Sequence, residues 1–439
     1  MKKFWLNFNS KIDGVLNGLI LAYLFLLPWS AIYIFDEKLI GGAKWQFGTG
    51  IVYATELLLW LIFLLFFIVN RRQKFPSLFE IKSRLARPNW PTLLVLMLWG
   101  FIFWSGLSIL WAPEKSAGFY FWFRFLEAGV FFFVLLLSKL DVRKISWAIL
   151  LSAGVQAGLA ISQFLNQQTW GNKFLGLVAH SPSELGALVV ETADGRWLRA
   201  YGSFNDPNLL GGFLAIALVT GVWLMAQTKY KKTLLALTAL IVFGWFFTFS
   251  RASALALIVG LAIILITSQK QALIAALKTT FTIAVTTIVL AIIFSPLIFS
   301  RANLSGRLEA GSVSQRAEQI QTAWQIFRAQ PLLGVGLNNY TYVLSQANPG
   351  QPAYDYREAE NIYLLTLAET GLLGFLFLAG LIIAAASISF RNRNYFGLSL
   401  LLMILILGNF YHYPYSQYQG LILFFIILIL SAENYSRQS

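Results

Sequence analysis

The stretch FGWFFTFSRASALALIVG, residues 243 to 260, places a single arginine inside a long apolar run. Between Lys232 and Lys270 lie 37 residues, and Arg251 is the only charged residue among them, with 18 residues on either side. A bilayer core about 30 Å thick takes roughly 20 helical residues that rise ~1.5 Å each. Because the 37-residue run is nearly twice that length, it predicts two membrane helices with Arg251 at the turn between them.

The composition of the whole chain agrees with a membrane protein. Hydrophobic residues make up 58% of the sequence and charged residues 12%, whereas about 25% of the residues in soluble domains are charged. The chain has no cysteine, which excludes disulfides, iron–sulfur clusters and thiolate chemistry. His180 and His412 are far apart in the sequence and give no metal-ligand spacing. The first apolar run lacks a small-residue cleavage site, so we expect it to be a retained helix.

Apolar runs of suitable length predict an all-α, polytopic membrane protein with twelve spans. The predicted spans are residues 15–34, 48–69, 91–111, 118–138, 145–165, 208–227, 233–249, 252–268, 279–299, 361–388, 396–411 and 419–432. The chain is thereby divided into five helices (1–165), a loop (166–207), four helices (208–299), a second long loop (300–360), and three helices with a tail (361–439).

The distribution of basic residues predicts which side of the membrane each loop occupies. With the N-terminus inside, 20 of the 33 lysines and arginines fall on the inner side, 12 fall on the outer side, and Arg124 lies within a span. This bias follows the positive-inside rule and predicts cytoplasmic termini with both long loops outside. The formal net charge of +14 is therefore a topology signal, and we do not expect nucleic-acid binding.

Four ionisable residues within the spans suggest an open cavity in the outer leaflet. Glu56, Arg124, Glu127 and Glu369 each lie about six to nine residues from the outer end of a span, or roughly 9 to 14 Å deep. Such groups are costly in lipid and usually face a bundle interior or a cavity. Alternatively, Arg124 and Glu127 pair on one helix face, and the two other glutamates are neutral and hydrogen-bonded.

The first long loop contains a predicted hairpin and a predicted helix cap. Residues 187–201, ALVVETADGRWLRAY, alternate around an Asp-Gly turn as a β-hairpin does. Pro207 and Asn208 then begin a helix, and Asp206 is placed as its N-cap. Asp206 is either a cap alone or a catalytic carboxylate.

The second long loop contains a predicted amphipathic helix. Ser312 and Gln315 have capping-box spacing, and Pro331 ends the helix. Arg316 shares a face with the apolar stripe, so we expect it to face the membrane cavity or the bundle rather than solvent. Glu358 and Glu360 precede the next span, where carboxylates either stabilise a helix N-terminus or act as a general base.

Several of these stretches together resemble the O-antigen ligase/polymerase superfamily. LRAYGSFNDPNLLGGFL, FTFSRASALAL, SQRAEQIQTAWQIFRAQPLLGVGLNNY and AENIYLLTLAETGLLG occur in the order and topological positions of that family, and FYHYPYSQYQGLILF resembles a C-terminal stretch of some members. The resemblance implies a plasma-membrane glycosyltransferase that moves a glycan from a polyprenyl diphosphate carrier to an acceptor hydroxyl on the outer face.

The resemblance also implies roles for individual residues. Arg251 and Arg316 match arginines thought to bind the lipid diphosphate, which suits the fixed fork of guanidinium donors. Glu360 stands where the family commonly has a catalytic histidine, and Asp206 stands where many members have another histidine. Both replacements leave a carboxylate that can accept a proton. Asn208 and Asn361, which flank these positions, are further cavity candidates.

We therefore expect metal-independent transfer without a cofactor, because no DxD-type motif is found and two guanidinium groups can offset the diphosphate charge. The resemblance implies that the transfer is inverting. The expected partners are the carrier-linked glycan, membrane lipids, and an acceptor glycan, lipid or protein. The sequence leaves ligase and polymerase open. A transporter or flippase for lipid-linked glycans, or an inactive scaffold of the same family, is the alternative. Transporters often have broken helices near the midplane, whereas the charges here lie in the outer half of the spans.

Overall fold

The computed structural model of the 439-residue chain describes residues 2–70, 89–138, 140–303 and 307–432. Most of the predicted basic inner loop (71–88), Lys139 and the tail (433–439) lie outside the described residues.

Each of the twelve predicted spans corresponds to a helix, which confirms the all-α, polytopic membrane fold. These helices are α1 (Lys2–Leu26), α2 (Ala54–Asn70), α4 (Trp90–Leu107), α5 (Lys115–Leu137), α6 (Val142–Asn166), α7 (Pro207–Met225), α8 (Lys231–Phe246), α9 (Arg251–Thr267), α10 (Lys270–Ile293), α14 (Ile362–Arg391), α15 (Tyr395–Phe410) and α17 (Tyr418–Ala432). By length and composition, α4 with the following turn, α5, α6, α7, α10 and α14 are long and apolar enough to cross a membrane.

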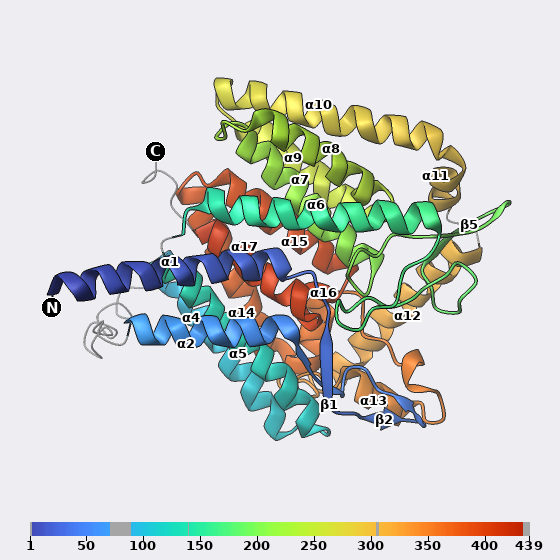
Figure 1. The fold of residues 1–439 in the computed structure, drawn as a ribbon. Coiled ribbons are helices and arrows are strands. Elements are labelled where there is room, and N and C mark those ends of the chain that lie inside the picture. The colour runs from blue at the N-terminus through green and yellow to red at the C-terminus, as the bar shows by residue number, and fades with distance from the viewer. Residues whose placement is uncertain (1, 71–88, 139, 304–306, 433–439) are drawn as a thin grey trace.

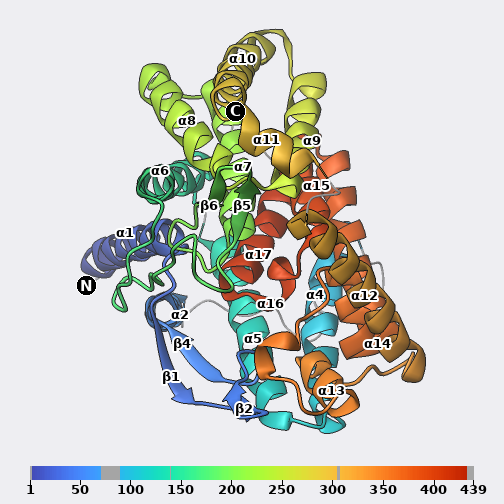
Figure 2. The same ribbon diagram turned by 90° about the vertical axis from the view of Figure 1, so that its right-hand side faces the viewer.

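The remaining elements gather at one end of the bundle, opposite the end where α1 begins and α17 finishes (Figure 1). They are β1 (Ile32–Asp36), β2 (Leu39–Ile40), β3 (Ala43–Lys44), β4 (Gly50–Tyr53), β5 (Val189–Thr192), β6 (Gly195–Leu198), α11 (Ser295–Ala302), α12 (Arg307–Ala329), α13 (Tyr340–Ala347), α16 (Tyr413–Ser416), and the 3-10 turns η1 (Ser108–Leu110) and η2 (Ala353–Asp355). We call this end, seen face-on in Figure 2, the loop end.

The centre of the bundle is formed by α7 and α17, whose side chains are buried almost throughout. α7 packs against α6, α8, α9, α10 and α15, and α17 packs against α5, α14, α15 and α16. A helix that is apolar on all sides suits a protein core or the lipid of a membrane, and here other helices surround both. Gly211, Gly212 and Gly221 of α7 allow close approach, because an added Cβ at Gly212 would lie 2.9 Å from Leu407 of α15.

The structure corrects the first two predicted spans at their loop-end boundaries. α1 finishes at Leu26 and α2 begins at Ala54, whereas the predicted spans included residues 27–34 and 48–53. Pro28 cannot continue a helix, and the β-branched and aromatic residues beyond it pair as antiparallel strands, with Ile32 opposite Tyr53 and Asp36 opposite Gly50. These strand residues were included in the predicted spans because they are as apolar as the residues of a membrane helix.

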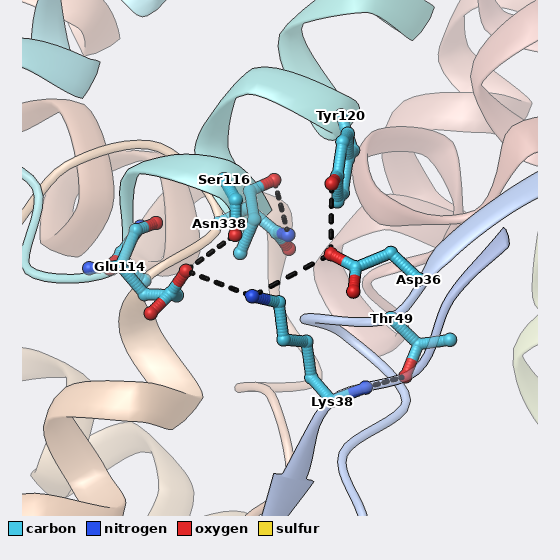
Figure 3. A network of polar contacts seen from close by, with 9 residues as sticks. Asp36, Lys38, Thr49, Glu114, Ser116, Tyr120 and Asn338 are labelled. Carbon is cyan, nitrogen blue, oxygen red and sulfur yellow. Dashed lines mark hydrogen bonds and ion pairs between the residues drawn. The ribbon is translucent and has the colours of Figure 1, made fainter.

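A polar network fixes this small sheet to the start of α5. Figure 3 shows Lys38 between two carboxylates, with its Nζ atom 3.6 Å from Asp36 Oδ2 and 3.7 Å from Glu114 Oε1. The Tyr120 hydroxyl donates to Asp36 over 2.8 Å, and the Lys38 amide donates to Thr49 Oγ1 over 3.3 Å. These contacts hold the sheet in place at the loop end.

The long helix α14 is broken at Gly371, where the backbone has φ 67° and ψ −171°. The loop after α12 fills the break, because the amides of Val335 and Gly336 donate to the carbonyls of Ala368 and Glu369, and the Leu372 amide donates to Pro331. A break within a membrane helix requires such partners, since lipid offers none.

Two helix boundaries in the second half also differ from the predictions. α10 finishes at Ile293 and α11 starts at Ser295 with Pro296 in its first turn, so the predicted span 279–299 is two helices. α12 begins at Arg307 rather than at Ser312, so the capping-box residues lie inside it. The five residues Arg307 to Gly311 contain no proline, so they extend the helix.

Candidate functional site

A cavity of about 1240 Å³ opens at the loop end. Its walls come from the hairpin β5–β6, the N-termini of α7 and α9, helices α11, α12 and α16, and the segment before α14. These elements are far apart in the sequence, and the bundle brings them together.

Cationic side chains outnumber acidic ones on the cavity walls. The cationic residues are Lys44, Arg196, Arg199, Arg251, Arg301, Arg307, Arg316 and Arg357, and the acidic residues are Asp206, Glu318, Glu358 and Glu360. A cavity lined by an excess of one sign concentrates ligands of the other sign. This cavity therefore favours an anionic ligand.

Arg251 is the first residue of α9, where the turn between α8 and α9 reaches the cavity. Ser250 caps this helix by accepting from the Ser253 amide, and Phe249 before it has a positive φ of 47°, which turns the chain sharply. Arg251 Nη1 donates to the carbonyl of Arg301 over 3.1 Å, and Arg301 Nη2 donates to the carbonyl of Phe249 over 3.2 Å. The two arginines thus lie side by side on the cavity wall.

Arg316 lies on α12 and reaches across the cavity to the start of α14. Its Nε atom is 3.0 Å from Glu360 Oε2, and its guanidinium lies over the Tyr411 ring at 5.8 Å. Burial opposes the charge of Arg316, but Glu360 and Tyr411 favour it and raise its pKa above the usual value. The predicted inward orientation of Arg316 is confirmed.

Asp206 is the N-cap of α7, as predicted, because its Oδ1 accepts from the Asn208 amide over 2.6 Å. The predicted hairpin next to it is confirmed, with Val189 opposite Leu198 and Thr192 opposite Gly195. Asp206 also faces the cavity. Burial raises the pKa of Tyr413 well above its usual value, and the nearby charge and hydrogen bond of Asp206 add to this shift.

Arg199 is a site residue that the sequence reasoning missed. It is only 4% exposed, although it lines the cavity. Its Nε donates to the Thr248 carbonyl over 2.7 Å and its Nη2 donates to Asn208 Oδ1 over 2.5 Å. Arg199 therefore joins the starts of α7 and α9, and the Asn208 candidate serves as its partner.

Five of the predicted cavity residues do not line this cavity. Arg124 Nε is 3.6 Å from Glu56 Oε1, so Arg124 pairs with α2 rather than with Glu127. Glu127 accepts a hydrogen bond from Trp60.

The other two of these residues belong to α14 or to its cap. Glu369 accepts from the Tyr415 hydroxyl over 3.0 Å and from the Tyr340 amide over 3.3 Å. Asn361 caps α14 and donates to Asn409 Oδ1 over 3.1 Å. Each makes structural contacts between elements.

His412 is the second residue that the sequence reasoning missed. It lies between α15 and α16, lines the cavity, and places its Nδ1 atom 2.9 Å from Glu358 Oε2. The signal was available in FYHYPYSQYQG, where polar residues interrupt an apolar run. A single histidine has no recognisable partner in the sequence, because Glu358 comes close to His412 only in the tertiary structure.

Metal ligation has no candidate cluster in the described part of the chain, where no three histidine, cysteine, aspartate or glutamate side chains converge. The contacts of the cavity carboxylates include guanidinium partners, as in Arg316–Glu360, and an imidazole partner, as in His412–Glu358.

Comparison with known proteins finds one family to which part of the chain is similar. Residues 235–379 match the family model described as O-Antigen ligase, a glycosyltransferase-type ligase family. The match runs from α8 to the middle of α14 and includes Arg251, Arg316 and Glu360. No curated protein matches the chain. The match, the apolar helical bundle and the cationic cavity agree, and residues 235–379 are similar to the O-antigen ligase family, which supports the resemblance of the chain to the O-antigen ligase/polymerase superfamily.

Proposed function

We propose that this protein transfers a glycan from a polyprenyl diphosphate carrier to an acceptor hydroxyl at the outer face of the plasma membrane. The observation that carries the proposal is the placement of Arg251 and Arg316, from two separate elements, on one cavity at the end of an apolar bundle. A polyprenyl diphosphate has the matching shape, because its tail remains in the bilayer while its headgroup reaches the membrane surface.

Arg251 and Arg316 would bind the diphosphate in this reaction. Guanidinium groups offer several fixed donors to phosphate oxygens, and the bonds are charge-assisted. Negative charge builds on the bridging oxygen as the bond to the glycan breaks, so donors aimed at that oxygen stabilise the transition state. Arg301, beside Arg251, is positioned to extend the same cationic surface.

Glu360 and Asp206, which the sequence analysis compares with the histidines of the family, both line the cavity and are candidates to take the acceptor's proton. Each of these carboxylates also makes a structural contact: Glu360 pairs with Arg316, and Asp206 caps α7. We expect direct displacement at the anomeric carbon, which gives inversion, and we expect the guanidinium groups to supply the charge stabilisation without a metal.

The proposed placement in the membrane follows from charge and from the fold. The start of α1 and the end of α17, which precede and follow the predicted cytoplasmic ends of the chain, lie at the opposite end of the bundle from the loop end (Figure 1), which supports an external cavity. The acceptor can be a second glycan, a lipid or a protein, so the reaction is either polymerisation or ligation.

A flippase for lipid-linked glycans is the second candidate, and the break in α14 favours it, because transporters commonly contain broken helices. Two observations support the enzyme instead. The loop after α12 fills the break, and the cationic cavity is confined to the loop end rather than the middle of the bundle.

The deciding experiment uses the purified full-length protein with a polyprenyl diphosphate-linked oligosaccharide. In detergent with candidate acceptors, release of free polyprenyl diphosphate together with a glycosylated acceptor supports transfer. In sealed vesicles, movement of intact carrier-linked glycan between leaflets without carrier release would contradict it and support the flippase. An inactive scaffold would give neither result.

A further inference from the structure

His412 and Glu358 at the cavity wall form a close imidazole–carboxylate pair that the predicted mechanism does not use. His412 Nδ1 lies 2.9 Å from Glu358 Oε2, and it also contacts Ser416 Oγ. Glu358 is 3% exposed, so its carboxylate is desolvated apart from this contact. The Glu358 backbone belongs to the segment before α14, while His412 follows α15, so the pair forms only in the folded chain.

The pair fixes the orientation of the imidazole ring. A carboxylate is an acceptor, so the neutral ring carries its proton on Nδ1 and leaves an electron pair on Nε2. Within the described residues, both polar contacts of the ring are made by Nδ1. Nε2 is therefore the atom that remains for a molecule in the cavity. The buried carboxylate of a catalytic triad orients its histidine in the same way.

Charged groups from several elements surround His412. Glu358 and Glu360 belong to the segment before α14, Asp206 precedes α7, and Tyr411 and Tyr413 flank the ring. Burial alone lowers the pKa of His412, but the charge and hydrogen bond of Glu358, with smaller contributions from Glu360 and Asp206, raise it above its ordinary value. Arg316 lines the same cavity and pairs with Glu360.

The other two candidate bases each have one carboxylate oxygen engaged. Glu360 is held by Arg316 at 3.0 Å, and an ion pair with a guanidinium makes a carboxylate a weaker proton acceptor. Asp206 Oδ1 accepts from the Asn208 amide at 2.6 Å. His412 differs from both, because it is an imidazole base held at Nδ1 by a carboxylate, and its described contacts leave Nε2 as an acceptor atom.

We propose that His412 is the general base of the transfer reaction and that Glu358 is its positioning residue; this assignment rests on the proposed function. Nε2 takes the proton of the acceptor hydroxyl while that oxygen forms a bond to the anomeric carbon of the donor glycan. The bond between that carbon and the diphosphate oxygen breaks, and its electron pair leaves with the diphosphate beside Arg251 and Arg316. Glu360 then serves to hold Arg316 rather than to accept the proton.

The test compares His412→Asn, Glu358→Gln and Glu360→Gln in the full-length protein. Asn places an amide donor where Nδ1 was, so it keeps the contact with Glu358 but has no counterpart of Nε2. We expect His412→Asn to lower kcat by about 10²–10⁴-fold, the usual contribution of general acid–base catalysis. Binding of the polyprenyl diphosphate donor should stay as in the wild type, because Arg251 and Arg316 are untouched.

The pH dependence separates a base from a structural residue. A base works in its deprotonated form, so wild-type kcat should rise with pH through the pKa of His412. Glu358→Gln removes the charge that raises this pKa, so the rising limb should move to lower pH. A loss of rate in Glu358→Gln with the limb unmoved would overturn the positioning role, and wild-type kcat in His412→Asn would overturn the base.

Nuclear magnetic resonance of labelled histidine gives a readout that does not depend on turnover. The chain has two histidines, so the His412 signals can be assigned by comparison with His180→Gln. We expect protonation of Nδ1 in the neutral form and a pKa that falls in Glu358→Gln. A ring protonated on Nε2, or a pKa unchanged by Glu358→Gln, would contradict the proposal even if His412→Asn failed to fold.

Failure of this inference is distinguishable from failure of the proposed function. If the wild type releases no carrier with any acceptor, the transfer reaction itself is refuted. If the wild type transfers the glycan and His412→Asn does so equally well while Glu360→Gln is inactive, only the identity of the base is refuted.

Discussion

The Nε atom of Arg316 lies 3.0 Å from Oε2 of Glu360 and joins α12 of the second long loop to the residue before the Asn361 cap of α14. A diphosphate entering the cavity would therefore meet an arginine that already has an anionic partner. The pair holds the guanidinium in place, and it also competes with the ligand for the same donors.

This relationship predicts opposite effects of two substitutions at Glu360. Gln can still accept from Arg316 Nε but carries no charge, so Glu360→Gln should bind the donor as tightly as wild type or more tightly. Ala removes the contact, so Glu360→Ala should bind it more weakly because Arg316 is no longer held. Binding of a polyprenyl diphosphate analogue by titration checks both. Weaker binding by Glu360→Gln than by Glu360→Ala would contradict this role.

The two arginines predicted to bind the diphosphate can be tested against a control arginine on α12, the helix of Arg316. Arg251→Ala and Arg316→Ala should each weaken donor binding by about 10- to 100-fold, because a hydrogen bond to a charged group contributes roughly 1.5–3 kcal/mol. Lys should restore little, since it lacks the planar fork. Arg328→Ala is the control, because Arg328 of α12 stacks on Trp324 at 5.2 Å and does not line the cavity. Unchanged donor binding in both cavity variants would exclude the diphosphate role.

Asp206 caps α7 and also lines the cavity, and substitutions can distinguish a capping role from a catalytic one. Asn caps a helix about as well as Asp, whereas Ala at an N-cap costs about 1 kcal/mol. We expect Asp206→Asn to keep the thermal stability of the protein in detergent and Asp206→Ala to lower it. Asp141→Asn is the matched control, because Asp141 caps α6 by accepting from the Arg143 amide over 2.8 Å. An inactive but stable Asp206→Asn, beside an active Asp141→Asn, would assign the base to Asp206.

Membrane topology follows from labelling of single cysteines, since the chain contains none. A cysteine at Gln346 of α13, which is exposed at the loop end, should react with an impermeant reagent in intact cells. A cysteine at Gln227, exposed after α7, should react only once the membrane is opened. The reverse pattern would place the cavity on the cytoplasmic side and refute the proposed location.

The contact between the loop after α12 and the break in α14 should depend on glycine at two positions. Gly334 and Gly371 have φ of 68° and 67°, and an added Cβ would lie 2.4 Å from the Glu369 carbonyl and 2.3 Å from the Leu332 carbonyl, respectively. A left-handed backbone costs a residue other than glycine on the order of 1–3 kcal/mol, before any clash.

We therefore expect Gly334→Ala and Gly371→Ala to lower the midpoint of thermal unfolding by more than Gly350→Ala. Gly350 has φ 96° but nothing within 4 Å of an added Cβ, so its variant reports the backbone cost without the clash. Equal shifts in all three variants would show that the close approach contributes nothing to stability.

The sequence alone determined the class of the protein and the location of its helices. Hydrophobic length is a local property, so each apolar run near 20 residues identified a helix, and a charge such as Arg251 identified the turn between two of them. Asp206 and the hairpin β5–β6 were also predictable, because a helix cap and a tight turn depend on adjacent residues.

The tertiary structure decided which of the candidate residues share a cavity. Intramembrane charge indicated Glu56, Arg124, Glu127 and Glu369, but these residues contact other elements away from the cavity. Burying a charged group in the membrane costs free energy whether the group contacts other helices or binds a ligand. The depth of a residue within a predicted span therefore does not distinguish the two roles.

The pairs that matter most join positions that no sequence pattern relates. His412 meets Glu358 across 54 positions of the chain, and Arg316 meets Glu360 across 44. Such contacts depend on how α12, α14 and α15 pack around the loop end, and packing is a property of the whole bundle. The sequence thus determined which groups were available, and the fold decided which of them became partners.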